Sequence, residues 1–197
     1  MMDVDDLILI TLSASEDGKI EGRTRLQKLA FFVSEIMGID AGYEPHIYGP
    51  YSSALRNIVE AQVSRGIISE QRVPWSSSGF SGHDLDKVRY DYELKPQGKL
   101  ALDERLQADP QGFARAQELV QKVNSTGADY RVLSWAAKLY WILAEERGRP
   151  VPLPRAQERA HELGWPISHQ QAQQGIALLR ELELVRVVST PAQPGRS

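Results

Sequence analysis

The chain has 197 residues, a net charge of −3 and no cysteine, and 42% of its residues are apolar and 25% charged. This composition is typical of a globular protein, and the lack of cysteine excludes disulfides, zinc fingers and thiol catalysis. No apolar run reaches the roughly 18 residues that a membrane span needs. Because Asp3, Asp5 and Asp6 stand where a secretory signal would be basic, we expect a cytoplasmic protein with no membrane association.

The first half of the chain begins with two predicted helices. Apolar residues at helical spacing over 3–15 indicate the first helix. Thr24 and Gln27 have the spacing of a capping box, so the second helix is predicted to begin at Thr24 and to end at Gly38. The aromatic segment 43–51 is too rich in Pro and Gly for a helix, and it indicates a short strand leading into a turn.

A third helix and a hairpin are predicted next. Ser52 or Ser53 can cap a helix that ends at Gly66. Two alternating segments joined by a Ser/Gly-rich loop then indicate two strands, which occupy 67–73 and 87–94 around the loop 74–86. Helix, helix, short strand, helix and hairpin is the winged-helix order. We therefore expect residues 1–96 to form a winged helix-turn-helix domain.

The second half is predicted to be a helical domain over 97–190. Its first helices cover 97–107, 110–124 and 130–147. The third of these is apolar around most of its circumference, which indicates either central burial or an oligomer interface. From the second alternative we expect a homodimer that forms through residues 130–146.

The predicted domain ends in a second helix-turn-helix-like unit. A short helix over 156–163, a turn at Gly164-Trp165-Pro166-Ile167 and a helix capped by Ser168 make up this unit. Residues 184–188 are expected to continue it as a strand, and 191–197 to be a disordered tail. The expected fold class is therefore mainly α with a small β-hairpin.

Two motifs at matching spacing suggest a family. The segment Gly22-Arg23-Thr24-Arg25-Leu26-Gln27-Lys28-Leu29 precedes Tyr48-Gly49-Pro50-Tyr51-Ser52, and Gly66-Ile67-Ile68 follows. In these residues the first half of the chain resembles the YwgA-like winged-helix proteins of bacteria and archaea, and more distantly the Panacea domain of SocA-type antitoxins. The resemblance implies a winged-helix scaffold in a regulatory or defence-associated setting, and it supplies no established ligand-binding residues.

The third helix carries candidate base-reading residues. Ser53, Arg56 and Asn57 share one face with Glu60, opposite the apolar residues. Arginine pairs with guanine and asparagine with adenine in the major groove, whereas Glu60 would repel phosphate. The alternative is that this face is simply solvated.

Two further polar groups are candidates for nucleic-acid binding. Basic residues cluster around the start of the second helix, where they could hold phosphate or pair with local acids such as Glu21; they are Lys19, Arg23, Arg25 and Lys28. Outward glutamines on the last helix could read adenine or simply face solvent; they are Gln170, Gln173 and Gln174. The Tyr48-to-Tyr51 motif is expected to shape a turn, with ring stacking as its alternative.

Catalysis is not indicated anywhere in the sequence. The four histidines are scattered, and no pair has the spacing of a helical metal site, so we expect neither metal nor cofactor. No phosphate-binding loop, dinucleotide fingerprint or nucleophile motif is present. The leading expectation is a DNA-binding regulator. The alternative is a protein–protein adaptor or antitoxin-like module without direct DNA binding, which the acidity of the N-terminal half favours.

Overall fold

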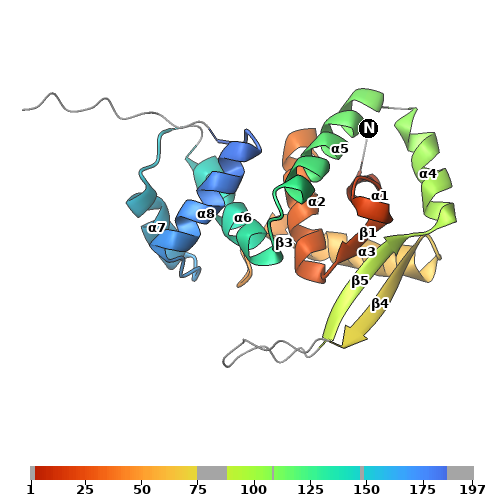
Figure 1. The fold of residues 1–197 in the computed structure, drawn as a ribbon, viewed down its shortest axis with the longest axis horizontal. Coiled ribbons are helices and arrows are strands. Elements are labelled where there is room, and N and C mark those ends of the chain that lie inside the picture. The colour runs from red at the N-terminus through yellow and green to blue at the C-terminus, as the bar shows by residue number, and fades with distance from the viewer. Residues whose placement is uncertain (1–2, 75–87, 108, 147–148, 186–197) are drawn as a thin grey trace, which may run out of the picture.

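The computed structural model describes residues 3–74, 88–107, 109–146 and 149–185, and within them the chain is mainly helical with two small antiparallel sheets (Figure 1). The helices are α1 (Val4–Ser13), the short 3-10 turn η1 (Glu16–Gly18), α2 (Arg23–Met37), α3 (Ser53–Ser64), α4 (Pro96–Leu106), α5 (Pro110–Ser125), α6 (Tyr130–Glu145), α7 (Leu153–Glu162) and α8 (His169–Glu181). The strands are β1 (Lys19–Glu21), β2 (Tyr43–Glu44), β3 (Tyr51–Ser52), β4 (Ile68–Pro74) and β5 (Val88–Leu94). No described helix is long and apolar enough to cross a membrane.

Helix α1 is the centre of the first half, as its apolar sequence predicts. Asp3 and Asp6 form a capping box at its start, which satisfies free backbone N–H groups. Every residue from Asp6 to Leu12 is buried, because α2, α3, α4 and α5 all pack around the helix. The predicted helix over 3–15 is confirmed.

Helix α2 forms where expected, but its start differs from the prediction. It begins at Arg23 after Gly22, whose φ of 92° favours glycine, and no side chain caps it. The predicted Thr24/Gln27 capping box is wrong, because the Gln27 side chain bonds to Ser52 instead. Gly38 ends the helix in a left-handed conformation, as predicted.

The larger sheet contains one strand that the sequence did not indicate. β4 and β5 pair antiparallel, which confirms the predicted hairpin, and β1 adds to the other edge of β5 to give the order β1-β5-β4. The loop predicted between the hairpin strands lies outside the described residues from residue 75 onward. β1 has three residues and only Ile20 is buried, so its alternation was too short to be recognised.

The short strand leading into a turn that was predicted over 43–51 is confirmed, and a second short strand follows the turn. The two strands, β2 and β3, pair with each other. Between them, residues 46–50 make a turn in which the Gly49 N–H donates to the His46 carbonyl, and Gly49 has a φ of 95°. This segment is called the 46–50 turn below. Ser52 then caps α3 by accepting from the Leu55 N–H, so the predicted third helix is confirmed.

Helix α6 lies between α2 and α8 and connects the two parts of the molecule (Figure 1). On one side Phe31 of α2 meets the rings of Tyr140 and Trp141. On the other side α8 approaches so closely that a Cβ on Gly175 would lie 2.8 Å from Leu139 Cδ1. Central burial therefore accounts for the apolar sequence of α6 without a second copy. The homodimer through 130–146 stays a prediction.

Helices α7 and α8 are joined by the predicted turn. Trp165 in this turn is buried, and Ser168 and Gln171 form a capping box at the start of α8. Leu184 and Val185 do not form the expected strand, and residues 186–197, including the predicted tail, lie outside the described residues. The division at residues 96 and 97 stays a prediction. Helices α5 and α6 pack directly against α2, and α4 and α5 against α1.

Candidate functional site

The outer face of α3 is polar and open. Leu55, Val59 and Gln62 are buried against the rest of the protein, so the opposite side of the helix faces solvent. Ser53, Arg56, Asn57 and Glu60 are all exposed there, as the sequence indicated. Arg56 donates to Glu60 at 2.9 Å, an exposed pair of the kind that contributes little to stability.

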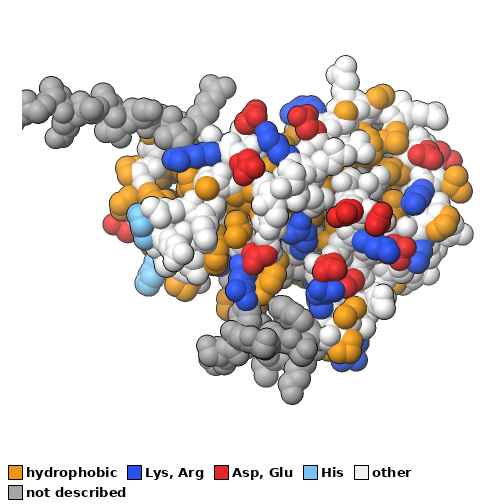
Figure 2. Space-filling model, in the orientation of Figure 1, with side chains coloured by type: hydrophobic (Ala, Val, Ile, Leu, Met, Phe, Trp, Pro, Cys, Tyr) orange, Lys and Arg blue, Asp and Glu red, His pale blue; other side chains and the backbone are white. Residues whose placement is uncertain are grey.

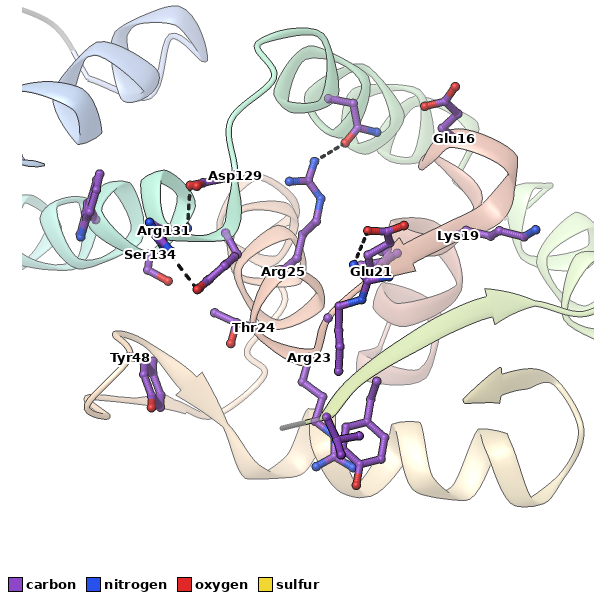
Figure 3. Close-up of a pocket in the computed structure, with 18 of the residues that line it drawn as sticks. Glu16, Lys19, Glu21, Arg23, Thr24, Arg25, Tyr48, Asp129, Arg131 and Ser134 are labelled. Carbon is purple, nitrogen blue, oxygen red and sulfur yellow. Dashed lines mark hydrogen bonds and ion pairs between the residues drawn. The ribbon is translucent and has the colours of Figure 1, made fainter. Parts of the chain in front are cut away.

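The four basic residues near the start of α2 do not form one patch. Lys19 is exposed on β1 and lies at the far end of the site from Arg131 (Figure 3). Arg23 and Arg25 point in opposite directions, and Lys28 is buried. The four residues predicted to form a single phosphate-binding cluster therefore lie in four different environments.

Arg23 is held against the sheet and remains half exposed. Its guanidinium stacks on the Tyr90 ring at 3.6 Å, its Nε donates to the Tyr92 hydroxyl and it pairs with Glu70. Burial opposes the charge of Arg23, but the hydrogen bond to Tyr92 and the nearby Glu70 raise its pKa overall. The positive charge of Arg23 is fixed in place at the edge of the sheet.

Arg25 joins α2 to the end of α5 and to the loop between α5 and α6. One nitrogen of its guanidinium donates to the Ala128 carbonyl at 2.7 Å, and another donates to Asn124 Oδ1 at 2.9 Å. Burial lowers its pKa, with Glu21 and Asp129 acting in the opposite direction. The contacts of Arg25 are those of a residue that holds two segments together.

Lys28 holds the end of the 46–50 turn, and Gln27 holds Ser52 just after it. The Gln27 amide donates to the Ser52 carbonyl and accepts from the Ser52 N–H, at 3.0 and 3.1 Å. The Lys28 ammonium donates to the Pro50 carbonyl at 2.5 Å. These contacts explain why the two sequence motifs occur together. Lys28 is 1% exposed, so it is not placed to contact DNA.

The predicted glutamines of α8 lie on its open face. Gln170, Gln173 and Gln174 are exposed, whereas Ala172, Gly175, Leu178 and Leu179 face the core. Within the described residues, none of the three glutamine side chains makes a hydrogen bond. Their arrangement agrees equally with solvation and with binding.

A groove of about 990 Å³ opens between β1, the start of α2 and the start of α6 (Figure 3). We call it the α2–α6 groove. Its wall includes Tyr48 from the 46–50 turn and Tyr90 from β5. The charged residues of its described lining comprise six cations and four carboxylates: Lys19, Arg23, Arg25, Arg89, Arg131 and Lys138, and Glu16, Asp17, Glu21 and Asp129.

Several of these charges are already neutralised. Arg89 pairs with Glu21 and Asp91, and Asp129 caps α6 by accepting from the N–H groups of Arg131 and Val132. On the face shown in Figure 2, Lys and Arg side chains alternate with Asp and Glu and do not gather in a patch of one sign. The surface is therefore not uniformly attractive to a polyanion.

Lys138 lines the groove and was not among the site residues predicted from the sequence. It is 9% exposed, and within the described residues its ammonium has no hydrogen-bond acceptor. The ammonium lies 5.8 Å from the centre of the Trp165 ring. Burial lowers its pKa. The available signal was a lysine inside an apolar helix, but only the packing of α2 and α8 against α6 shows that it is enclosed.

The sequence matches no protein-family model, and it has no significant match among curated proteins.

Proposed function

We propose that the chain is a DNA-binding regulatory protein of the winged-helix type. Support comes from the order of elements over residues 4–94: α1, η1, β1, α2, the short pair β2 and β3, α3, β4 and β5, with β1 paired to β5 at the sheet edge. This order places a three-stranded sheet beside three helices, as in winged helices. The regulatory or defence-associated setting follows from the motif resemblance.

The observation that carries the proposal is the open face of α3. Winged helices insert this helix into the major groove, where arginine and asparagine side chains reach base edges. Arg56 and Asn57 are adjacent and exposed, and Arg56 interacts with the side chains of Glu60 and Tyr51. Lys19 and Arg23 would contact the phosphate backbone beside it.

A mobility-shift assay with genomic DNA fragments tests the proposal. At about 50 mM salt we expect retardation that weakens steeply toward about 200 mM, because phosphate contacts release counterions. Arg56→Ala should weaken specific binding roughly 10- to 100-fold, as expected for loss of a base contact. Lys99→Ala, at an exposed position on α4, is the matched control and should bind like the wild type.

The substitution Glu60→Gln should have the opposite effect on DNA affinity. It removes the carboxylate that faces the DNA and releases Arg56 from its pair, so binding should strengthen. Absence of any retardation by folded protein at about 50 mM salt would refute the proposal.

The second candidate is a protein–protein adaptor or antitoxin-like module. The 46–50 turn favours it, because Ile47 and Tyr48 are neighbouring large side chains that are 66% and 53% exposed. Exposed apolar and aromatic side chains of this kind are enriched where proteins bind one another. The mobility shift separates the two candidates, since the adaptor gives none.

A further inference from the structure

Lys138 carries a charge that the protein leaves without a counterion. Its side chain lines the α2–α6 groove, and within the described residues no carboxylate or carbonyl accepts from its ammonium. The ammonium reaches the groove and is only partly desolvated, but even partial burial of a charge without a partner is unfavourable. The ammonium of Lys138 is therefore desolvated at a cost in free energy, which a bound anion would offset.

A second lysine makes this position more electropositive. A Cβ on Gly49 would lie 2.9 Å from Lys138 Cγ and 3.6 Å from Lys28 Cε, so the two lysines approach Gly49 from α6 and α2. The Lys138 charge adds to burial in lowering the Lys28 pKa to about 7. The two amines therefore favour an anion over a cation or a neutral ligand, because a bound anion stabilises the protonated form of both.

The groove also has the size and the rings for a small organic ligand. Its volume of about 990 Å³ is at the upper end of the range for small-molecule sites. Flat side chains with polar tips line it beside the cations: Tyr48, Tyr90, Tyr130 and Trp135. Such rings stack on nucleobases, and cations beside them hold phosphate.

The position of Lys138 argues against the DNA backbone as the anion. A duplex presents its phosphates on a wide convex surface, whereas the Lys138 side chain is nine-tenths enclosed by protein. A terminal phosphate on a small molecule can enter the groove where a duplex cannot.

We propose that the α2–α6 groove is a binding site for a nucleoside phosphate, with Lys138 holding the phosphate and the groove's aromatic side chains stacking on the base. The groove shares Lys19 and Arg23 with the proposed phosphate contacts, but its described lining includes no residue of α3, so the site goes beyond the proposed DNA binding. A winged-helix regulator with such a site would respond to a nucleotide.

Isothermal titration of the full chain with ATP, GTP, CTP and UTP tests this proposal, with adenosine and inorganic pyrophosphate as the two partial probes. At least one nucleotide should bind more tightly than either partial probe, because only a nucleotide uses both the cation and the rings. Lys138→Met should weaken that binding about tenfold or more, since it removes a charge-assisted hydrogen bond. Lys99→Met, an exposed lysine on α4, is the control and should leave it unchanged.

Folding of the Lys138→Met variant is checked by its urea unfolding midpoint, which should not fall, because the substitution removes an unpaired buried charge. Trp135→Leu gives an independent test, since loss of the ring should weaken nucleotide but not pyrophosphate binding. No binding of any nucleotide at about 1 mM, or equal binding by folded Lys138→Met, overturns the proposal. Arg56→Ala should leave nucleotide binding intact, so failure of this site and failure of DNA binding are separable.

Discussion

Replacing Lys28 by methionine should remove a pH dependence of stability that the fold builds into α2. Lys28 is 1% exposed, and its ammonium donates only to the Pro50 carbonyl among described hydrogen-bond acceptors. Burial, and then the charge of Lys138, lower the Lys28 pKa from 10.5 to about 7. Methionine has a similar shape and no charge, so it keeps the packing and deletes the titration.

The direction in which stability changes with pH depends on whether the folded or the unfolded chain binds the Lys28 proton more tightly. Between pH 7 and 10.5 the unfolded chain keeps Lys28 protonated while the folded chain releases the proton, so stability rises with pH. Below pH 7 both states are protonated, and the folded state bears the full cost of the buried charge. The rise approaches about 1.4 kcal/mol per pH unit, or about 3 kcal/mol between pH 7 and 9.5.

Urea unfolding of the wild type and Lys28→Met at half-unit steps from pH 6.5 to 9.5 measures this effect. The free energy of unfolding of the variant, relative to the wild type, should fall by about 3 kcal/mol from pH 7 to 9.5. Loss of the Pro50 hydrogen bond shifts the whole curve and does not change this difference. The range stops below pH 10 because the raised pKa values of Tyr43 and Tyr92 lower stability above it in both proteins.

Lys99→Met, at an exposed site on α4, should run parallel to the wild type over the whole range. Parallel curves for the wild type and Lys28→Met would refute the reasoning. They would mean that the Lys28 charge is as well solvated in the folded chain as in the unfolded one.

Two further predictions concern the segment that α2 holds. Gln27→Ala removes both hydrogen bonds to the Ser52 backbone and leaves those buried groups unpaired, which should lower the free energy of unfolding by about 2–4 kcal/mol; Gln173→Ala on the open face of α8 should change it by under about 0.5 kcal/mol. Gly49→Ala combines a φ of 95° with a Cβ 2.9 Å from Lys138 Cγ, whereas Gly127→Ala has a φ of 66° and no atom within 4 Å. Gly127→Ala should therefore lower the free energy of unfolding in urea by about 1–2 kcal/mol, from backbone strain alone. Gly49→Ala should lower it by more, because its Cβ also meets Lys138, and an equal loss for the two variants would contradict the close contact.

The helices were the most predictable part of the fold. Their apolar spacing is local, and it identified α1, α2, α3 and the helices from α4 to α8 before any packing was known. Capping residues predicted the start of a helix correctly where their side chains bond within that same helix, as Ser168 and Gln171 do at the start of α8. They failed at Thr24 and Gln27, because Gln27 bonds across the fold to Ser52.

The candidate site was less predictable, because it depends on contacts between distant segments. The exposed face of α3 follows from its own periodicity, and the sequence placed Arg56 and Asn57 on it correctly. The basic cluster near the start of α2 did not remain a cluster. Arg25 bonds to residues about a hundred positions away, and Lys28 is enclosed by the 46–50 turn.

Periodicity by itself determined which segments are helical and which of their faces are polar, because both depend on residues within a few turns of each other. Only the tertiary structure decided that β1 exists, that Gln27 and Lys28 hold the turn, and that Lys138 lies enclosed in a groove. Each of these depends on α2, α6 and β5 meeting in space. No local sequence pattern predicts how the packing of distant segments changes the solvation of a charged side chain.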